Sequence, residues 1–276
     1  MLAAVIQMNS SADRQANLAQ AADLLRRAAG QGAGLCVLPE HFAHMQPEGL
    51  PLAEPQTIAG PTVSFLATLA RELGLWIVGG TFAERARTPG KAHNTCPVLD
   101  PTGRLVGVYR KIHLFDLAAP GQAPLLESRR VAPGRRLTVV DTPIGRLGPC
   151  VCYDLRFPEL HRRLRLLGAQ VIAAPSAFTK LTGQAHWELL VRARAVENAC
   201  FVLAAAQWGP HGQGRESFGQ AMITNPWGEV VAQCPPGPGL ALAEVNAEVV
   251  EGFRRRLDST LHARLLPRAW RAKGRP

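Results

Sequence analysis

Apolar runs of strand length alternate with amphipathic helical stretches along this 276-residue chain. Leu2–Gln7 is an almost unbroken apolar run and predicts a buried strand, whereas Asp13–Ala29 carries apolar residues at helical spacing and predicts a helix. Leu35–Leu38 predicts the next strand, which Pro39 ends. Strands that alternate with helices are typical of the α/β class.

The same pattern continues toward the end of the chain. Further helices are predicted over Thr62–Leu73, Pro158–Leu167, Ala185–Asn198 and Glu248–Leu257. Further strands are predicted over Leu75–Val78, Leu137–Val140, Arg146–Val151, Val171–Ala174, Cys200–Ala206 and Leu240–Val245. Pro149 lies within one of these strands, and because proline cannot donate to a ladder, we expect a bulge there.

Two predicted hairpins have the same form, each with a turn that contains Pro and Gly, Asp100–Gly103 and Asn225–Gly228. Their strands are predicted over Val98-Leu99 and Leu105–Tyr109, and over Met222–Thr224 and Val230–Ala232. The repetition indicates two pseudo-equivalent halves that face each other, as in a two-sheet sandwich covered by helices. No linker rich in Gly or Ser separates them, so we expect a single domain.

Composition narrows the class of protein. Hydrophobic residues make up 47% of the chain and charged residues 19%, as in compact soluble enzymes. No apolar run is long enough to span a membrane, and Met1–Met8 is too short and wrongly flanked for a signal peptide. The six cysteines lie mostly inside apolar runs, which indicates buried, reduced thiols and a cytoplasmic protein.

The net charge of +10 is concentrated at the end of the chain, where eight Lys or Arg and one Asp lie between Arg254 and Pro276. The rest of the chain is close to neutral for its size. A basic tail more often solvates a surface or an oligomer contact, and no basic stretch is interleaved with aromatic residues for stacking on bases. We therefore expect no nucleic-acid partner.

Three reactive side chains stand at the exits of predicted strands. Glu40 closes the segment Leu38-Pro39-Glu40, Lys111 lies within Tyr109–Leu114, and Cys152 follows the strand that ends at Val151. An acid, an amine and a thiol at three strand ends can together cleave an amide.

Each of these groups has a chemical task. The turn around Cys152, followed by a helix, exposes a nucleophile and turns backbone N–H groups toward an oxyanion. A free thiol has a pKa of about 8.5, so it needs a base to attack at neutral pH. A carboxylate partly stripped of water, such as Glu40, can accept the thiol proton. The Lys111 ammonium stabilises thiolate and oxyanion and holds Glu40 charged.

Other interpretations stay open at this point. A lone Cys or Lys near a strand end is usually structural. Cys150 and Cys152 could form half of a metal site, but no second pair and no spaced histidines complete it, so we expect no metal. A Cys–His hydrolase is a further alternative, although spacing singles out none of the eight histidines as the partner.

Taken together, Leu38-Pro39-Glu40, Tyr109–Leu114 and Cys152–Phe157 resemble the catalytic signatures of the nitrilase superfamily of carbon–nitrogen hydrolases, in the same order. The resemblance runs from residue 1 to about residue 246 and implies a single-domain, four-layer α-β-β-α sandwich without metal or organic cofactor. It also implies a homodimer that stacks sandwiches. Residues 247–276, a helix and the basic tail, would belong to the same domain or to an oligomer contact.

The resemblance also implies residue roles. Glu40 is the general base, Lys111 the oxyanion stabiliser and Cys152 the nucleophile. Glu127 matches the second glutamate of the family, which positions Lys111 and the substrate; taken alone it would be an acid in a surface loop.

Further segments resemble the branch that contains deaminated-glutathione amidases and ω-amidases, namely Pro120–Gln122, Glu127-Ser128, Pro175–Glu188, Arg192–Asn198, Ala204–Gln207 and Ser217–Gly219. Substrates of that branch carry carboxylates, which a guanidinium can bind with two hydrogen bonds. Arg156 is therefore the expected anchor, with Tyr153, Phe178 and Thr182 as further substrate-binding residues. Lys180 or Arg215 near the mouth could bind a second carboxylate.

We expect an amidase that hydrolyses a small carboxylated amide through a Cys thioester, with deaminated glutathione favoured. An ω-amidase acting on 2-oxoglutaramate or 2-oxosuccinamate, an N-carbamoyl amino-acid hydrolase and a nitrilase proper are alternatives with the same chemistry. From another class, the chain could be an idle interaction or sensor protein that keeps the fold. The four intact residues Glu40, Lys111, Glu127 and Cys152 speak against that reading.

Overall fold

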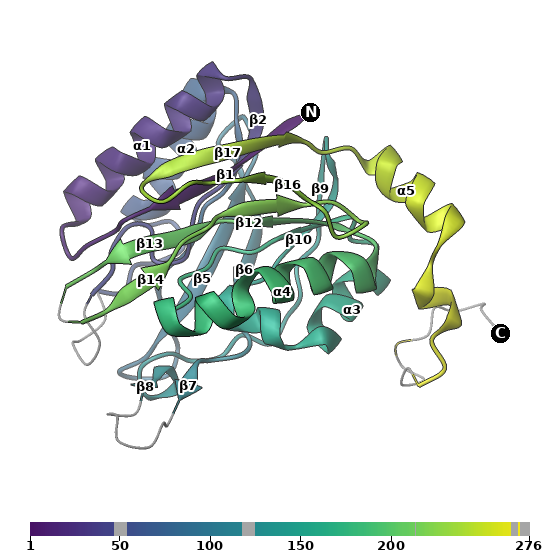
Figure 1. Ribbon diagram of the computed structural model, residues 1–276. Helices are drawn as coiled ribbons and strands as arrows, with labels where there is room; N and C mark the ends of the chain where they lie inside the picture. Colours follow the sequence, from purple (N-terminus) through teal and green to yellow (C-terminus); the bar gives the residue numbers. More distant parts are fainter. Residues whose placement is uncertain (47–53, 118–124, 213, 266–269, 271–276) are drawn as a thin grey trace.

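The computed structural model describes residues 1–46, 54–117, 125–212, 214–265 and 270. Within these residues two large β-sheets lie face to face, and helices cover the outer face of each sheet (Figure 1). This arrangement confirms the predicted four-layer α-β-β-α sandwich. No helix among the described residues has the length and apolar character that crossing a membrane requires.

The first sheet is built around β1 (Leu2–Met8) and has nine strands within the described residues. The others are β2 (Ala33–Val37), β3 (Trp76–Val78), β4 (Phe82–Arg85), β5 (Ala92–Leu99), β6 (Leu105–Arg110), β13 (Ala206–Pro210), β14 (Glu216–Phe218) and β17 (Gly239–Glu244). β1 runs parallel to β2 and β13 and antiparallel to β17.

The second sheet has the order β16-β15-β12-β11-β10-β9. Its strands are β9 (Val140–Thr142), β10 (Gly145–Pro149), β11 (Val171–Ala173), β12 (Phe201–Ala204), β15 (Met222–Thr224) and β16 (Val230–Gln233). A separate short pair is formed by β7 (Asp116–Leu117) and β8 (Leu125–Leu126).

Helices α1 (Arg14–Gly30) and α2 (Pro61–Leu73) pack on the first sheet, and α3 (Pro158–Leu166) and α4 (Lys180–Asn198) pack on the second. Helix α5 (Ala247–Arg256) follows β17 and begins at the cap Asn246, whose side chain accepts from the Glu248 N–H. Three short 3₁₀ turns complete the described elements: η1 (Glu127–Arg129), η2 (Cys152–Arg156) and η3 (Ser259–His262).

Strand β1 shows why its sequence lacks the usual apolar–polar alternation. Ala3 and Val5 face the core between the two sheets, whereas Ala4 and Ile6 face the core beneath α1 and α2. A strand buried on both faces needs apolar residues at successive positions. The predicted buried strand Leu2–Gln7 is thereby confirmed.

Most predicted elements are confirmed within one to three residues of their ends, but the run Cys200–Ala206 is not a single strand. It divides at Ala205 into β12 of the second sheet and the start of β13 of the first sheet. Periodicity cannot locate such a crossing, because these residues are apolar and buried throughout.

Two expectations near β10 were wrong. A strand was predicted over Leu137–Val140, but β9 spans Val140–Thr142. The turn between β9 and β10 is tight, with Thr142 paired directly with Gly145, so the strand lies closer to the turn than predicted. No bulge occurs at Pro149, which pairs in regular register with Ala173 of β11. On the opposite edge of β10, pairing with β9 ends at Leu147. Pro149 therefore has no strand on that edge to which a backbone N–H would have to donate, and proline is tolerated.

Helix α4 also begins earlier than predicted, at Lys180, because the Thr179 hydroxyl caps it by accepting from the Thr182 N–H. Some sequence predictions lie outside the described residues: the segment Pro120–Gln122, and residues 266–269 and 271–276 of the basic tail.

Candidate active site

The three reactive residues come together where carboxyl ends of strands from both sheets meet. Lys111 directly follows β6, Glu40 follows β2 after a short loop, and Cys152 opens η2 just after β10. A cavity of about 310 Å³ lies there. Its lining includes all eight residues singled out from the sequence: Glu40, Lys111, Glu127, Cys152, Tyr153, Arg156, Phe178 and Thr182.

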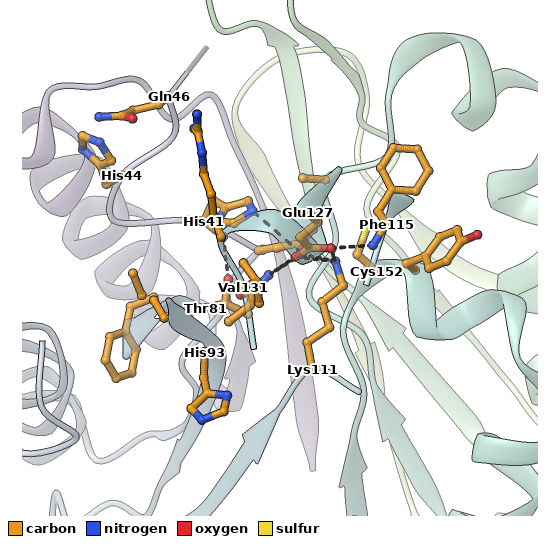
Figure 2. Close-up of a pocket in the computed structure, with 18 of the residues that line it drawn as sticks. His41, His44, Gln46, Thr81, His93, Lys111, Phe115, Glu127, Val131 and Cys152 are labelled. Carbon is orange, nitrogen blue, oxygen red and sulfur yellow. Dashed lines mark hydrogen bonds and ion pairs between the residues drawn. The ribbon is translucent and has the colours of Figure 1, made fainter. Parts of the chain in front are cut away.

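Lys111 lies between two carboxylates. Its Nζ is 3.0 Å from Glu40 Oε1. The same Nζ is 2.9 Å from Glu127 Oε2 (Figure 2). The Lys111 side chain is only 3% exposed, and burial alone would lower its pKa. Glu127 and Glu40 outweigh burial and hold the pKa of Lys111 well above its usual value, so the ammonium stays charged.

Asn94 joins the same cluster and was not found from the sequence. Its Nδ2 lies 2.9 Å from Glu40 Oε1 and 3.3 Å from Glu127 Oε1. The Phe115 backbone N–H donates to Glu127 Oε2 at 2.7 Å, which ties this glutamate to the loop after Lys111. Asn94 is an amide side chain inside the largely apolar strand β5. Because buried polar groups need hydrogen-bond partners, this position in the sequence could have indicated a polar cluster.

Glu40 and Cys152 are set up for proton transfer. Burial raises the pKa of Glu40, but Lys111, His41 and Cys152 together outweigh burial and hold this pKa below its usual range. Burial, and then the negative charge of Glu40, raise the pKa of Cys152 well above that of a free thiol. Among the neighbouring groups, the Glu40 carboxylate raises this pKa, and the Lys111 ammonium and the Ala177 backbone oppose it without reversing the shift. The resting site therefore holds a neutral thiol beside an ionised carboxylate.

The backbone at Cys152 is strained, with φ 47° in a region that residues with side chains seldom occupy. The turn is fixed from both sides, since the Cys152 N–H donates to Pro175 O at 3.0 Å and the Val151 N–H to Asp154 Oδ2 at 2.9 Å. Strained nucleophile turns of this kind lift the side chain out of the sheet.

Asp154 connects the two sequence motifs. It is fully buried and accepts hydrogen bonds from the Tyr109 hydroxyl at 2.7 Å and the His113 backbone N–H at 3.0 Å, with His113 Nδ1 at 2.8 Å. The His113 ring also stacks on Phe157, with ring centroids 3.7 Å apart. The loop that carries Lys111 is thus fastened to the turn that carries Cys152.

Arg156 lies among aromatic and imidazole side chains. Its Cζ is 5.8 Å from the ring centroid of Tyr153 and 5.3 Å from that of Phe178, and His186 Nδ1 is 3.3 Å from Nη1. These contacts orient the guanidinium at the cavity wall.

Of the two residues predicted to bind a second carboxylate, Lys180 and Arg215, one lies at the cavity and the other does not. Arg215 lines the cavity, whereas Lys180 is absent from the lining and pairs with Glu216 at 2.9 Å.

Three histidines also line the cavity: His41, His44 and His93. His41 Nε2 is 3.9 Å from Glu40 Oε1, and burial lowers the pKa of His41. The Glu40 carboxylate is the basic group that acts most strongly on the pKa of Cys152, which favours an acid over an imidazole as the base.

We expect Glu127→Gln to lower kcat by about 10- to 100-fold while the protein stays folded, because an amide keeps the shape but not the charge. The glutamine NH₂ group would also face either Lys111 Nζ or the Phe115 N–H, both of them donors. Steady-state kinetics and thermal unfolding check this, with Glu72→Gln as the control, since Glu72 pairs with Arg26 on the surface. An unchanged kcat/KM would make Glu127 a bystander.

Comparisons with known proteins agree on one family. The carbon–nitrogen hydrolase family model matches residues 2–255. Deaminated glutathione amidase of Homo sapiens is 45% identical over 270 residues, covering 95% of this chain and 82% of that protein. Omega-amidase NIT2 of Danio rerio is 36% identical over 261 residues, covering 95% and 94%.

Among solved structures, that of Saccharomyces cerevisiae Nit3, a member of branch 10 of the nitrilase superfamily, is similar with a TM-score of 0.82. It is 33% identical in sequence, and the match covers 93% of this chain and 94% of that one.

Proposed function

This chain belongs to the carbon–nitrogen hydrolase family and is an amidase, and on that premise we propose that its substrate is deaminated glutathione. The higher identity to a deaminated glutathione amidase, 45%, than to an ω-amidase, 36%, supports this choice. In this substrate a keto group replaces the amino group of glutathione's glutamyl residue. The acyl half then carries a 2-oxo carboxylate, and the leaving group is cysteinylglycine.

The observation that carries the mechanism is a buried ammonium between two carboxylates, in a cavity that Cys152 also lines. Glu40 takes the Cys152 proton as the sulfur attacks the amide carbon, and Lys111 binds the oxygen that becomes negative. Glu40 then delivers the proton to the departing nitrogen as the C–N bond breaks. Water, deprotonated by Glu40, hydrolyses the thioester and restores the thiol.

Glu127 holds Lys111 in this scheme. With Glu127 at 2.9 Å, the ammonium keeps a second countercharge when the Glu40 carboxylate is protonated during the reaction. Asn94 fixes the relative position of the Glu40 and Glu127 carboxylates by donating a hydrogen bond to each.

Arg156 binds the carboxylate of the acyl half. We expect Arg156→Lys to lower kcat/KM at least about tenfold on carboxylated amides, because an ammonium cannot form two parallel hydrogen bonds to a carboxylate or stack on Tyr153 and Phe178. Neutral amides should lose little. The measurement is kcat/KM on a matched pair of acid and neutral amide; equal losses on both would remove Arg156 from this role.

The test of the substrate is a panel assay by product release. We expect deaminated glutathione to give the highest kcat/KM among deaminated glutathione, 2-oxoglutaramate, glutamine, an N-carbamoyl amino acid and a simple nitrile. Each charge-assisted contact contributes about 1.5–3 kcal/mol, so the added glycine carboxylate can raise efficiency by tenfold or more. If 2-oxoglutaramate is hydrolysed more efficiently, the chain is an ω-amidase.

The compartment and assembly are part of the proposal. All six cysteines are free thiols and five are buried, which supports a reducing cytoplasm. A homodimer is supported by exposed apolar side chains on α4, α5 and the β15–β16 hairpin: Leu189, Val196, Trp227, Val231 and Val249. Sedimentation of a monomer at micromolar concentration would contradict it. Residues 247–276 would then belong to the domain of residues 1–246 or to this contact.

A further inference from the structure

Arg14 and Arg215, two of the five arginines that line the cavity, come from distant parts of the chain. Arg14 is the first residue of α1, and Arg215 immediately precedes β14. Arg14 acts electrostatically on His44, and Arg215 acts on His41. In Figure 2, His44 and Gln46 lie on the far side of His41 from Cys152. The two guanidiniums thus border the part of the cavity away from the thiol.

Neither guanidinium has a carboxylate partner within the described residues. Arg14 Nη2 donates to Thr62 Oγ1 at 2.9 Å, and Arg215 Nη1 donates to the Gln46 carbonyl at 2.8 Å. Arg110, by contrast, is paired with Glu84 at 2.6 Å. Glu54 also lines the cavity, but it is exposed and forms no ion pair with either arginine among the described residues.

Polar atoms without partners occur at the same place. His44 Nε2 and Gln46 Oε1 are buried and form no hydrogen bond within the described residues, and both residues line the cavity. Buried polar atoms normally form hydrogen bonds. Two such atoms without a partner, next to the guanidiniums of Arg14 and Arg215, indicate a ligand that brings an anionic group and further polar atoms.

We propose that Arg14 and Arg215 bind the carboxylate of the leaving group, at a subsite separate from Arg156. This rests on the proposed function, in which the leaving group is cysteinylglycine and its glycine carries the carboxylate. Gln46 Oε1 is an acceptor suited to a peptide N–H of the same group. The cavity then recognises the acyl half at Arg156 and the leaving group at the opposite end.

This division predicts a specific kinetic pattern. Deaminated glutathione and 2-oxoglutaramate yield the same thioester on Cys152, since the C–N bond breaks with departure of cysteinylglycine in one case and ammonia in the other. The second half-reaction, attack of water on that thioester, is identical. A leaving-group subsite therefore affects only the first substrate, whereas loss of Arg156 affects both.

The experiment measures kcat/KM of the wild type and of Arg14→Gln, Arg215→Gln and their double variant. Three substrates are used: deaminated glutathione, the same molecule with a C-terminal glycinamide, and 2-oxoglutaramate. We expect the wild type to prefer the free acid over the glycinamide at least about tenfold. Each single variant should lose about tenfold on the free acid and less than twofold on the other two, mainly through KM. Lys180→Gln, which removes a nearby charge outside the cavity, is the matched control and should leave all three values unchanged.

Equal losses of a variant on all three substrates would show a structural role for the arginines and overturn the subsite. So would an unchanged preference for the free acid in the double variant. Failure of the proposed function looks different, because the wild type itself would then not hydrolyse deaminated glutathione while still acting on another amide.

Discussion

Cys152→Ala is expected to lower kcat by on the order of 10⁶-fold, because the covalent step has no other nucleophile at hand. The neighbouring Cys150 is fully buried, and burial raises its pKa well above the usual value, so it cannot replace Cys152. The fold should be preserved, since alanine keeps the N–H that donates to Pro175 O.

The measurement is mass spectrometry of protein quenched in acid during turnover. Wild type should carry an acyl mass on the peptide that contains Cys152, and Cys152→Ala should carry none. Cys150→Ala is the matched control, because it removes a thiol two residues away without touching the cavity lining, and it should keep the adduct. An adduct retained in Cys152→Ala would assign the nucleophile elsewhere.

Lys111→Met has the next largest expected effect, on both activity and stability. The variant leaves Glu40 and Glu127 close together in the site without the cation between them. Removing one partner of a buried ion pair costs about 3–5 kcal/mol of unfolding free energy, and losing one oxyanion donor lowers kcat by about 10²–10³-fold. Lys180→Met removes an exposed ammonium paired with Glu216 and should change neither quantity appreciably.

The pH dependence gives a separate check. The pKa of Glu40 is lowered in the folded protein and that of Lys111 is raised, so the stabilisation is complete between the two unfolded values of about 4.3 and 10.4. It declines as pH falls toward the folded pKa of Glu40 or rises toward that of Lys111. Lys111→Met removes the strongest of the charges that lower the pKa of Glu40, so the acid limb of kcat/KM should move to higher pH. An unmoved acid limb would show that Lys111 does not set the charge of Glu40.

Strand ends made the reactive residues of the candidate site predictable from the sequence. Glu40, Lys111 and Cys152 each follow an apolar run, and polar residues at such exits meet where strands of packed sheets end together. Asn94 escaped notice because it lies inside β5 rather than at an end. Asp154 was visible within the motif, but its role depends on contacts with Tyr109 and His113, and sequence distance does not reveal those.

The sheet assignments were harder for a physical reason. Cys200–Ala206 is apolar and buried throughout, so nothing in its pattern marks the point at Ala205 where the chain leaves one sheet for the other. The early start of α4 was predictable in principle from the cap Thr179. Arg156 and Arg215 were anticipated from the sequence as basic residues of the cavity, but Arg14 was not, because only the folded chain brings it to the cavity.

The pairing of β1 has a consequence for synthesis of the protein. β1 gains its antiparallel neighbour only when β17, residues 239–244, has emerged from the ribosome. At roughly 5–20 residues per second, the nascent chain spends on the order of 10–50 s with one edge of this apolar strand uncovered. Because exposed strand edges pair with other chains, we expect the nascent chain to be prone to aggregation during this interval.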